Sequence, residues 1–113
     1  MSTDSLPDHC VPCRAESPKL DAEGIEARRH HVPRWTVENE RLVRRFELEN
    51  FRAALAWVNR IGMLAEEEDH HPDLHLTGWN KLEVVLWTHA VGGLHENDFV
   101  LAKKIDALEA RSR

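Results

Sequence analysis

Four carboxylates precede two imidazoles in residues 66–72, Glu-Glu-Glu-Asp-His-His-Pro, and acids and histidines fall at helical spacing. Glu66 and His70 are four residues apart, as are Glu67 and His71, so each pair can meet on one face of a helix. A carboxylate neighbour and the negative end of a helix dipole both favour a protonated imidazole. Such a histidine can donate a proton near neutral pH, as a general acid does. The same charges can also stabilise a helix end without chemistry, so both interpretations stay open.

A metal site is the other chemistry that these side chains suggest. His70, His71 and His75 are the candidate ligands, and the chain holds eight histidines in all. Zinc generally needs three or four ligands that converge on one point. Pro72 interrupts the helical spacing between His71 and His75, which disfavours that geometry. We therefore expect no metal site at these histidines.

Hydrophobic periodicity predicts the elements that position this segment. The strongest prediction is a helix that begins after Asn50 as N-cap and ends near His70, before Pro72. Weaker helices are expected over residues 17–32 and 97–110, the latter with Asn97 as a candidate cap. Strands are expected at residues 35–37, 42–48 and 81–88. The order α-β-β-α-β-α predicts an α+β fold, with helices packed on one face of an antiparallel sheet.

Length and composition indicate one domain. With 113 residues the chain can bury a single hydrophobic core. Residues 1–16 are poor in large apolar side chains and are interpreted as an N-terminal arm, followed by a domain over residues 17–113. The arm carries a lone CxxC pair, Cys10 and Cys13, without a second pair of metal ligands. We interpret these cysteines as reduced thiols.

Charge and hydropathy exclude two classes of partner. The formal net charge is −5, whereas binding of nucleic acid requires a basic face. No apolar run approaches the roughly 20 residues that span a bilayer, so we expect no membrane partner. The first nine residues lack the basic and apolar regions of a secretory signal. These features predict a cytoplasmic protein.

Several fixed intervals together form a recognisable signature: an acid, three residues, His-His-Pro, a short loop, an aromatic residue, nine residues, His, and then Asp. The residues that meet it are Glu66, His70, His71, Pro72, Trp79, His89 and Asp98. In this the chain resembles the pterin-4a-carbinolamine dehydratases, over about residues 20–108. The resemblance implies removal of water from a 4a-hydroxytetrahydropterin to give the quinonoid dihydropterin. It also implies a pterin substrate, no metal or cofactor, and assembly as a homodimer or homotetramer.

The resemblance further implies a role for each site residue. His70 and His89 would be general acids, and His71 would bind the pterin and act as base or orienting group. The supporting acids would set the tautomers and proton affinities of the imidazoles; they are Glu66, Asp69 and Asp98. The residues that would form the pterin slot are Trp35, Pro72, Thr88, Ala90 and Val91.

Two residues depart from the animal enzymes of this family. Leu74 stands where an aromatic residue is common, and Trp87 stands where a small polar residue is frequent. The chain is most similar to a branch that includes dehydratase-like Rubisco assembly factors, whose members often carry an N-terminal Cys-x-Pro-Cys like that of residues 10–13. This similarity implies an alternative function, a carboxysome-associated or plastid chaperone that binds the Rubisco large subunit. The sequence leaves open whether dehydratase chemistry is retained.

Overall fold

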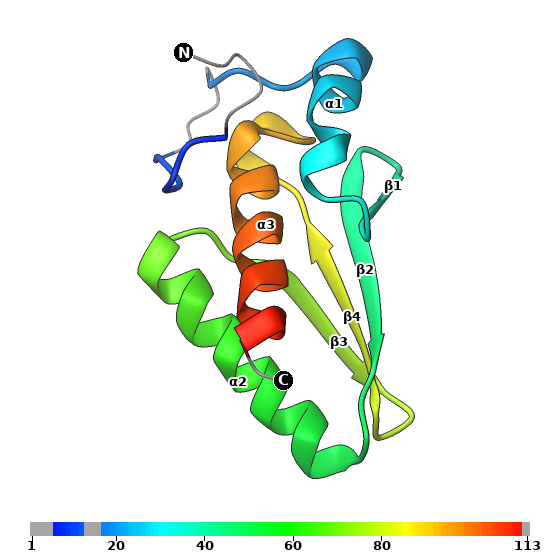
Figure 1. Ribbon diagram of the computed structural model, residues 1–113. Helices are drawn as coiled ribbons and strands as arrows, with labels where there is room; N and C mark the ends of the chain where they lie inside the picture. Colours follow the sequence, from blue (N-terminus) through cyan, green and yellow to red (C-terminus); the bar gives the residue numbers. More distant parts are fainter. Residues whose placement is uncertain (1–5, 13–16, 112–113) are drawn as a thin grey trace.

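Three α-helices and one four-stranded sheet form the part of the chain that the computed structural model describes, residues 6–12 and 17–111 (Figure 1). The elements are α1 (Ala22–Arg28), η1 (Arg29–His31), β1 (Thr36–Glu38), β2 (Arg41–Glu47), α2 (Phe51–Glu68), β3 (Asp73–Thr77), β4 (Lys81–Leu86), η2 (His89–Val91) and α3 (Glu96–Arg111). All strand pairs are antiparallel, in the order β1-β2-β4-β3. The predicted α+β class and order of helices and strands are confirmed.

The apolar face of the sheet holds α2 and α3 in place (Figure 1). Alternate residues of β2 and β4 face the helices, as period-two strands require. The fully buried contacts are made by Leu42, Leu82, Val84 and Leu86 of the sheet, by Ile61 of α2, and by Phe99, Leu101 and Ile105 of α3. Burying one such side chain contributes about 1.5–3 kcal/mol. This packing brings the end of α2 close to the beginning of α3.

Helix α2 begins and ends as its sequence predicts. The Asn50 side chain accepts a hydrogen bond of 2.8 Å from the Ala53 N–H, which confirms Asn50 as the N-cap. At the other end Asp69 adopts a left-handed conformation, with φ of 51°. Its backbone N–H bonds the carbonyl groups of Ala65 and Glu66. The chain therefore leaves the helix one residue before the two histidines.

The first helix is shorter than the sequence suggests. We expected it to begin near Ser17 and Pro18, but α1 begins at Ala22. Asp21 is the reason, because its side chain accepts a hydrogen bond of 2.8 Å from the Gly24 N–H and caps the helix there. The predicted hairpin follows, with Asn39 and Glu40 at φ of 52° and 57° in the two-residue turn between β1 and β2.

Strand β3 occupies the segment that we described as a loop. Leu74 and Leu76 face the core, and Asp73, His75 and Thr77 are exposed. This alternation is that of a half-buried strand, and Leu76 pairs with Leu82 of β4. Because β3 begins directly after Pro72, it directs the His-His-Pro segment along the sheet edge.

Helix α3 is capped by His95 and not by Asn97, so this prediction was wrong. The His95 Nδ1 accepts a hydrogen bond of 3.0 Å from the Asn97 N–H. In return the Asp98 side chain accepts one of 3.0 Å from the His95 N–H. This reciprocal arrangement is a capping box in which a neutral imidazole replaces the usual hydroxyl.

Candidate active site

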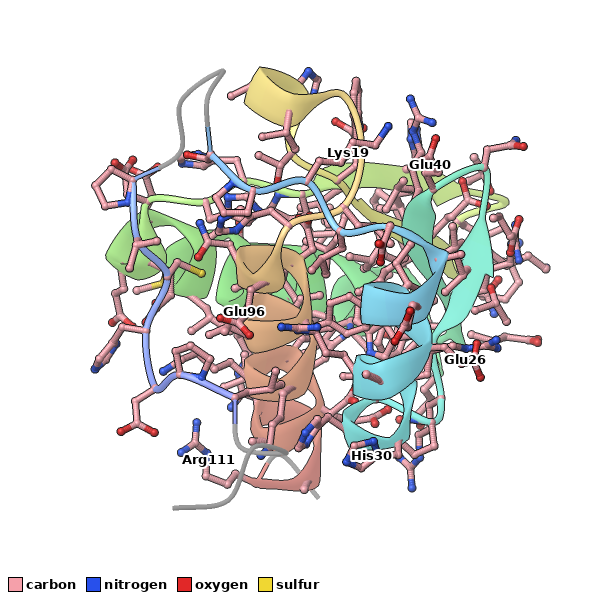
Figure 2. The ribbon with its side chains drawn as sticks, turned by 90° about the horizontal axis from the view of Figure 1, so that it is seen from above. Lys19, Glu26, His30, Glu40, Glu96 and Arg111 are labelled. Carbon is pink, nitrogen blue, oxygen red and sulfur yellow. The ribbon has the colours of Figure 1, made fainter. Side chains whose placement is uncertain are left out.

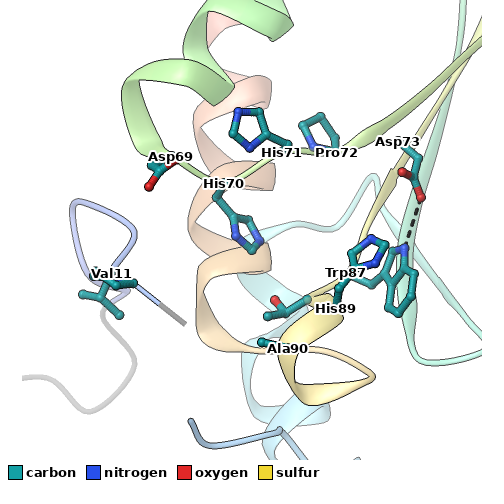
Figure 3. A pocket seen from close by; sticks show the side chains of 11 residues that line it. Val11, Asp69, His70, His71, Pro72, Asp73, Trp87, His89 and Ala90 are labelled. Carbon is teal, nitrogen blue, oxygen red and sulfur yellow. Dashed lines mark hydrogen bonds between the residues drawn. The ribbon is translucent and has the colours of Figure 1, made fainter. Parts of the chain in front are cut away.

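A cavity of about 440 Å³ lies between the end of α2, the segment after β4 and the N-terminal residues (Figure 3). His70, His71 and His89, the three histidines that we selected from the sequence, all line it. The other lining residues are Val11, Pro12, Asp69, Pro72, Asp73, Trp87, Thr88 and Ala90. Its volume is in the range that small-molecule sites occupy.

His70 is fixed by a buried carboxylate. Its Nε2 lies 2.7 Å from Oδ1 of Asp98, and Asp98 is fully buried. The other oxygen, Oδ2, accepts hydrogen bonds from the Thr88 hydroxyl at 2.9 Å and from the His95 N–H at 3.0 Å. Because a carboxylate only accepts, Nε2 of His70 carries the proton, and Nδ1 is the nitrogen left to meet a ligand. Asp98 therefore sets both the tautomer and the orientation of His70.

His71 differs in partner and in exposure. It pairs through Nε2 with Glu66, and the two side chains are 55% and 76% exposed. We expected Glu66 to pair with His70 and Glu67 to pair with His71. The left-handed Asp69 is the reason for the difference, because it breaks the helical spacing before His70 and turns that side chain towards α3. His71 is then the residue that meets Glu66.

His89 stacks on Trp87. The ring centroids are 3.7 Å apart and the planes are inclined by 30°. The Trp87 indole N–H donates to Asp73 Oδ2 at 3.1 Å, and the Arg41 guanidinium lies 4.1 Å from the ring centroid on one face. A hydrogen bond, a cation–π contact and the stacking thus orient an exposed imidazole at the cavity edge.

The remaining predicted residues divide into two groups. Pro72, Thr88 and Ala90 line the cavity, and Asp69 lines it while it also ends α2. Trp35 and Val91 do not line it. Trp35 is 3% exposed and belongs to the core, where its indole N–H donates to Asp106 at 2.9 Å. Its position is set by packing beneath α3, so the expectation that it closes the pterin slot does not fit the structure.

Val11 and Pro12 are lining residues that the sequence analysis missed. They belong to the predicted arm, of which residues 6–12 are described and Cys13 is not. Cys10 lies beside them, with its Sγ 3.5 Å from the Asn97 carbonyl oxygen. Burial and the charges of Glu68 and Asp98 raise the pKa of the Cys10 thiol to about 12, so it stays protonated. Nothing in the spacing of these residues indicates the contact, which depends on the tertiary fold.

Within residues 6–12 and 17–111, no group of three or more histidine, cysteine or acidic side chains is placed to hold a metal ion. No helix in those same ranges is long and apolar enough to cross a bilayer.

Comparison with known proteins gives a consistent result. The family described as pterin 4 alpha carbinolamine dehydratase matches residues 18–108. A Rubrobacter xylanophilus protein that carries the family name is 47% identical over 100 residues, covering 88% of this chain and 92% of that protein. A mitochondrial pterin-4-alpha-carbinolamine dehydratase of Arabidopsis thaliana is 40% identical over 88% of this chain and 56% of its own length.

Two solved structures share the fold. The transcriptional coactivator/pterin dehydratase of Brucella melitensis has a TM-score of 0.73 and 26% identity, over 80% of this chain and 98% of that chain. A pterin dehydratase-like protein described as a RuBisCO assembly factor in the alpha-carboxysome has a TM-score of 0.53 and 24% identity, over 66% and 86% of the two chains. The second similarity concerns the fold alone.

Proposed function

Because this chain belongs to the pterin 4 alpha carbinolamine dehydratase family, we propose that it dehydrates a pterin 4a-carbinolamine. The observation that supports the proposal is one cavity lined by three imidazoles, of which His70 and His71 are each paired with a carboxylate. Acid–base chemistry of this kind requires proton donors and acceptors around one flat substrate.

The proposed reaction is a proton transfer at two atoms of the pterin. An acid protonates the 4a-hydroxyl, the C4a–O bond breaks, and water leaves. Loss of the N5 proton to a base completes the C4a–N5 double bond of the quinonoid product. We assign the acid role to His70 and His89 and the base or binding role to His71, with Asp98 and Glu66 as their supporting acids. Thr88, through its bond to Asp98, and Pro72 and Ala90, as lining residues, complete the proposed site.

The experiment is a stopped-flow assay of carbinolamine dehydration with the purified full chain. We expect His71→Ala and His89→Ala to lower kcat by about 10² or more, as loss of a general acid or base does. His75→Ala is the matched control, since His75 is exposed on β3 and does not line the cavity. Wild-type turnover no faster than the uncatalysed reaction would refute the activity, and full activity in both site variants would refute the residue assignment.

Assembly of Rubisco is the second candidate function. Its support is the fold shared with the carboxysome assembly factor, together with the large Trp87 at the edge of the cavity. A pulldown with the tagged chain that recovers the Rubisco large subunit would favour it, and a dehydratase-inactive wild type would leave it as the better proposal. We rank it second, because binding a protein partner does not require three imidazoles around one cavity.

Oligomeric state and compartment are also part of the proposal. We infer a homodimer or homotetramer in the cytoplasm, in keeping with the family resemblance and the sequence composition. Analytical ultracentrifugation of the full chain measures the first. A sedimentation coefficient of a monomer at micromolar concentration would contradict it.

A further inference from the structure

The N-terminal residues 6–12 run along α3 on the side opposite α1, and they reach the cavity at Val11 (Figures 1 and 2). In Figure 3 Val11 lies on one side of His70, and Trp87 with His89 lies on the other. Val11 and Pro12 are part of the cavity lining. The segment therefore borders the same space as the histidines, although Val11 is about 60 residues before His70 and His71 and about 80 residues before His89 in the chain.

Two side chains hold this segment against the helices. Asn97 pairs with the backbone of Val11 in both directions: its Oδ1 accepts the Val11 N–H at 2.9 Å, and its Nδ2 donates to the Val11 carbonyl at 2.6 Å. Glu68 accepts the Cys10 N–H at 2.8 Å and bonds the His9 ring at 3.0 Å. We refer to Asn97 and Glu68 as the latch.

The latch is built into the frame of the site. Glu68 is the last residue of α2, and its side chain is 6% exposed. Asn97 is 3% exposed, and its backbone N–H is also the donor to the His95 cap, next to Asp98. Burial opposes ionisation of Glu68, but hydrogen bonds from Cys10, His9 and Lys104 outweigh it and lower its pKa to about 2. The acceptor for the Cys10 N–H thus stays ionised under any assay condition near neutral pH.

We propose that residues 6–12, held by the latch, are a wall of the substrate site, and that Val11 and Pro12 contact the bound pterin and determine its affinity. This inference rests on the proposed function for the identity of the ligand. Val11 supplies apolar surface on the side of His70 away from the Trp87–His89 stack, and Pro12, the next residue, is also part of the lining. An apolar contact here strengthens binding of substrate and transition state alike, so its loss raises KM and leaves kcat nearly unchanged.

The test compares two truncated chains. The first lacks residues 1–12 and so loses Val11 and Pro12. The second lacks only residues 1–5 and keeps both wall residues and their contacts with the latch. KM and kcat are measured for dehydration, and the dissociation constant is measured for biopterin, an unreactive probe, by quenching of tryptophan fluorescence. We expect the longer truncation to raise KM and the dissociation constant about tenfold, the effect of losing one or two apolar contacts, with kcat within about twofold. The shorter truncation should match the wild type.

Two full-length variants keep the test decisive if the longer truncation does not fold. Val11→Gly removes the wall contact and keeps the latch, and Asn97→Asp places a carboxylate against the Val11 carbonyl while it keeps the backbone bond to His95. Each should raise both constants several-fold, and Asn59→Asp on the exposed face of α2 should raise neither.

Unchanged constants in the truncation and in Val11→Gly would overturn the inference. So would a fall in kcat with unchanged KM, because that would indicate damage to the His70–Asp98 pair. A wild type without turnover would refute the proposed function only, and biopterin binding would still decide the role of the segment. A wild type with neither turnover nor biopterin binding would overturn both.

Discussion

His70 and His71 are neighbours in the chain, yet they occupy opposite environments. His70 is 9% exposed and bonds a fully buried carboxylate on another helix. The His71 side chain is 55% exposed and bonds a carboxylate of the preceding helix, α2, that is 76% exposed. A buried pair of this kind fixes one tautomer and one orientation, whereas an exposed pair is screened by water and can rearrange. The site thus combines one rigid imidazole with more adaptable ones at its rim.

The largest effect should follow from a change to Asp98, the carboxylate that fixes His70. In Asp98→Asn the amide nitrogen must face either His70 or the donors of Thr88 and His95, so one contact becomes a clash of donors. We expect kcat to fall by about 10²–10⁴, as when the orienting carboxylate of a catalytic triad is replaced. The free energy of unfolding should fall by about 1–3 kcal/mol, measured in urea.

Asp106→Asn is the matched control for that variant. Asp106 is a partly buried carboxylate on α3 that bonds Trp35 and Arg44, at a distance from the cavity. Burial outweighs those two contacts and raises its pKa. The control should lower stability and keep kcat within about twofold. If Asp98→Asn kept wild-type kcat, catalysis would not depend on the His70–Asp98 pair.

An intermediate effect is expected at His95, whose ring must be neutral to cap α3. Burial lowers its pKa, and the nearby Asp98 charge opposes that shift only in part. The unfolded chain then takes up the proton first as pH falls below about 6.5, so stability is complete above that pH and is lost below it. We expect urea unfolding to detect this loss between pH 7 and pH 5.

His95→Asn and His95→Ala separate titration from capping. The asparagine variant keeps an acceptor for the Asn97 N–H but does not titrate. It should therefore lose less of its free energy of unfolding than the wild type between pH 7 and pH 5. The alanine variant should be about 1 kcal/mol less stable than the wild type at pH 8, the usual cost of a lost N-cap. If His95→Asn lost as much free energy of unfolding as the wild type over this pH range, the pH dependence would belong to other groups.

The sequence predicted those elements whose signals are local. Asn50 and the apolar spacing after it defined α2, and the hairpin followed from β-branched residues around a polar turn. Strand β3 also had its signal, the alternation of Leu74 and Leu76 with polar residues, but we followed the family signature, which has a short loop between Pro72 and Trp79. The cap at His95 was not predictable from residue type, since imidazole is an unusual N-cap.

The site was predictable in its residue types and not in its pairings. A four-residue interval suggested that Glu66 meets His70, but a single left-handed residue, Asp69, changed both partners. Asp98 is a supporting acid by resemblance, whereas its bond to His70 depends on how α3 packs beside α2. Val11 and Trp35 differ from expectation for the same reason, because their positions depend on tertiary contacts that no spacing encodes.

The smallest effect should follow from a change to Glu66, the exposed partner of His71. Glu66→Gln removes the charge that His71 meets and keeps a hydrogen-bond acceptor. We expect the free energy of unfolding to change by less than about 1 kcal/mol and kcat/KM to fall by about threefold at most, with less difference at high salt. Glu67→Gln, one residue away and also exposed, is the control for charge alone. A loss of activity as large as that of Asp98→Asn would mean that His71 is held as tightly as His70 when substrate binds, and the contrast between the two histidines would then belong only to the free protein.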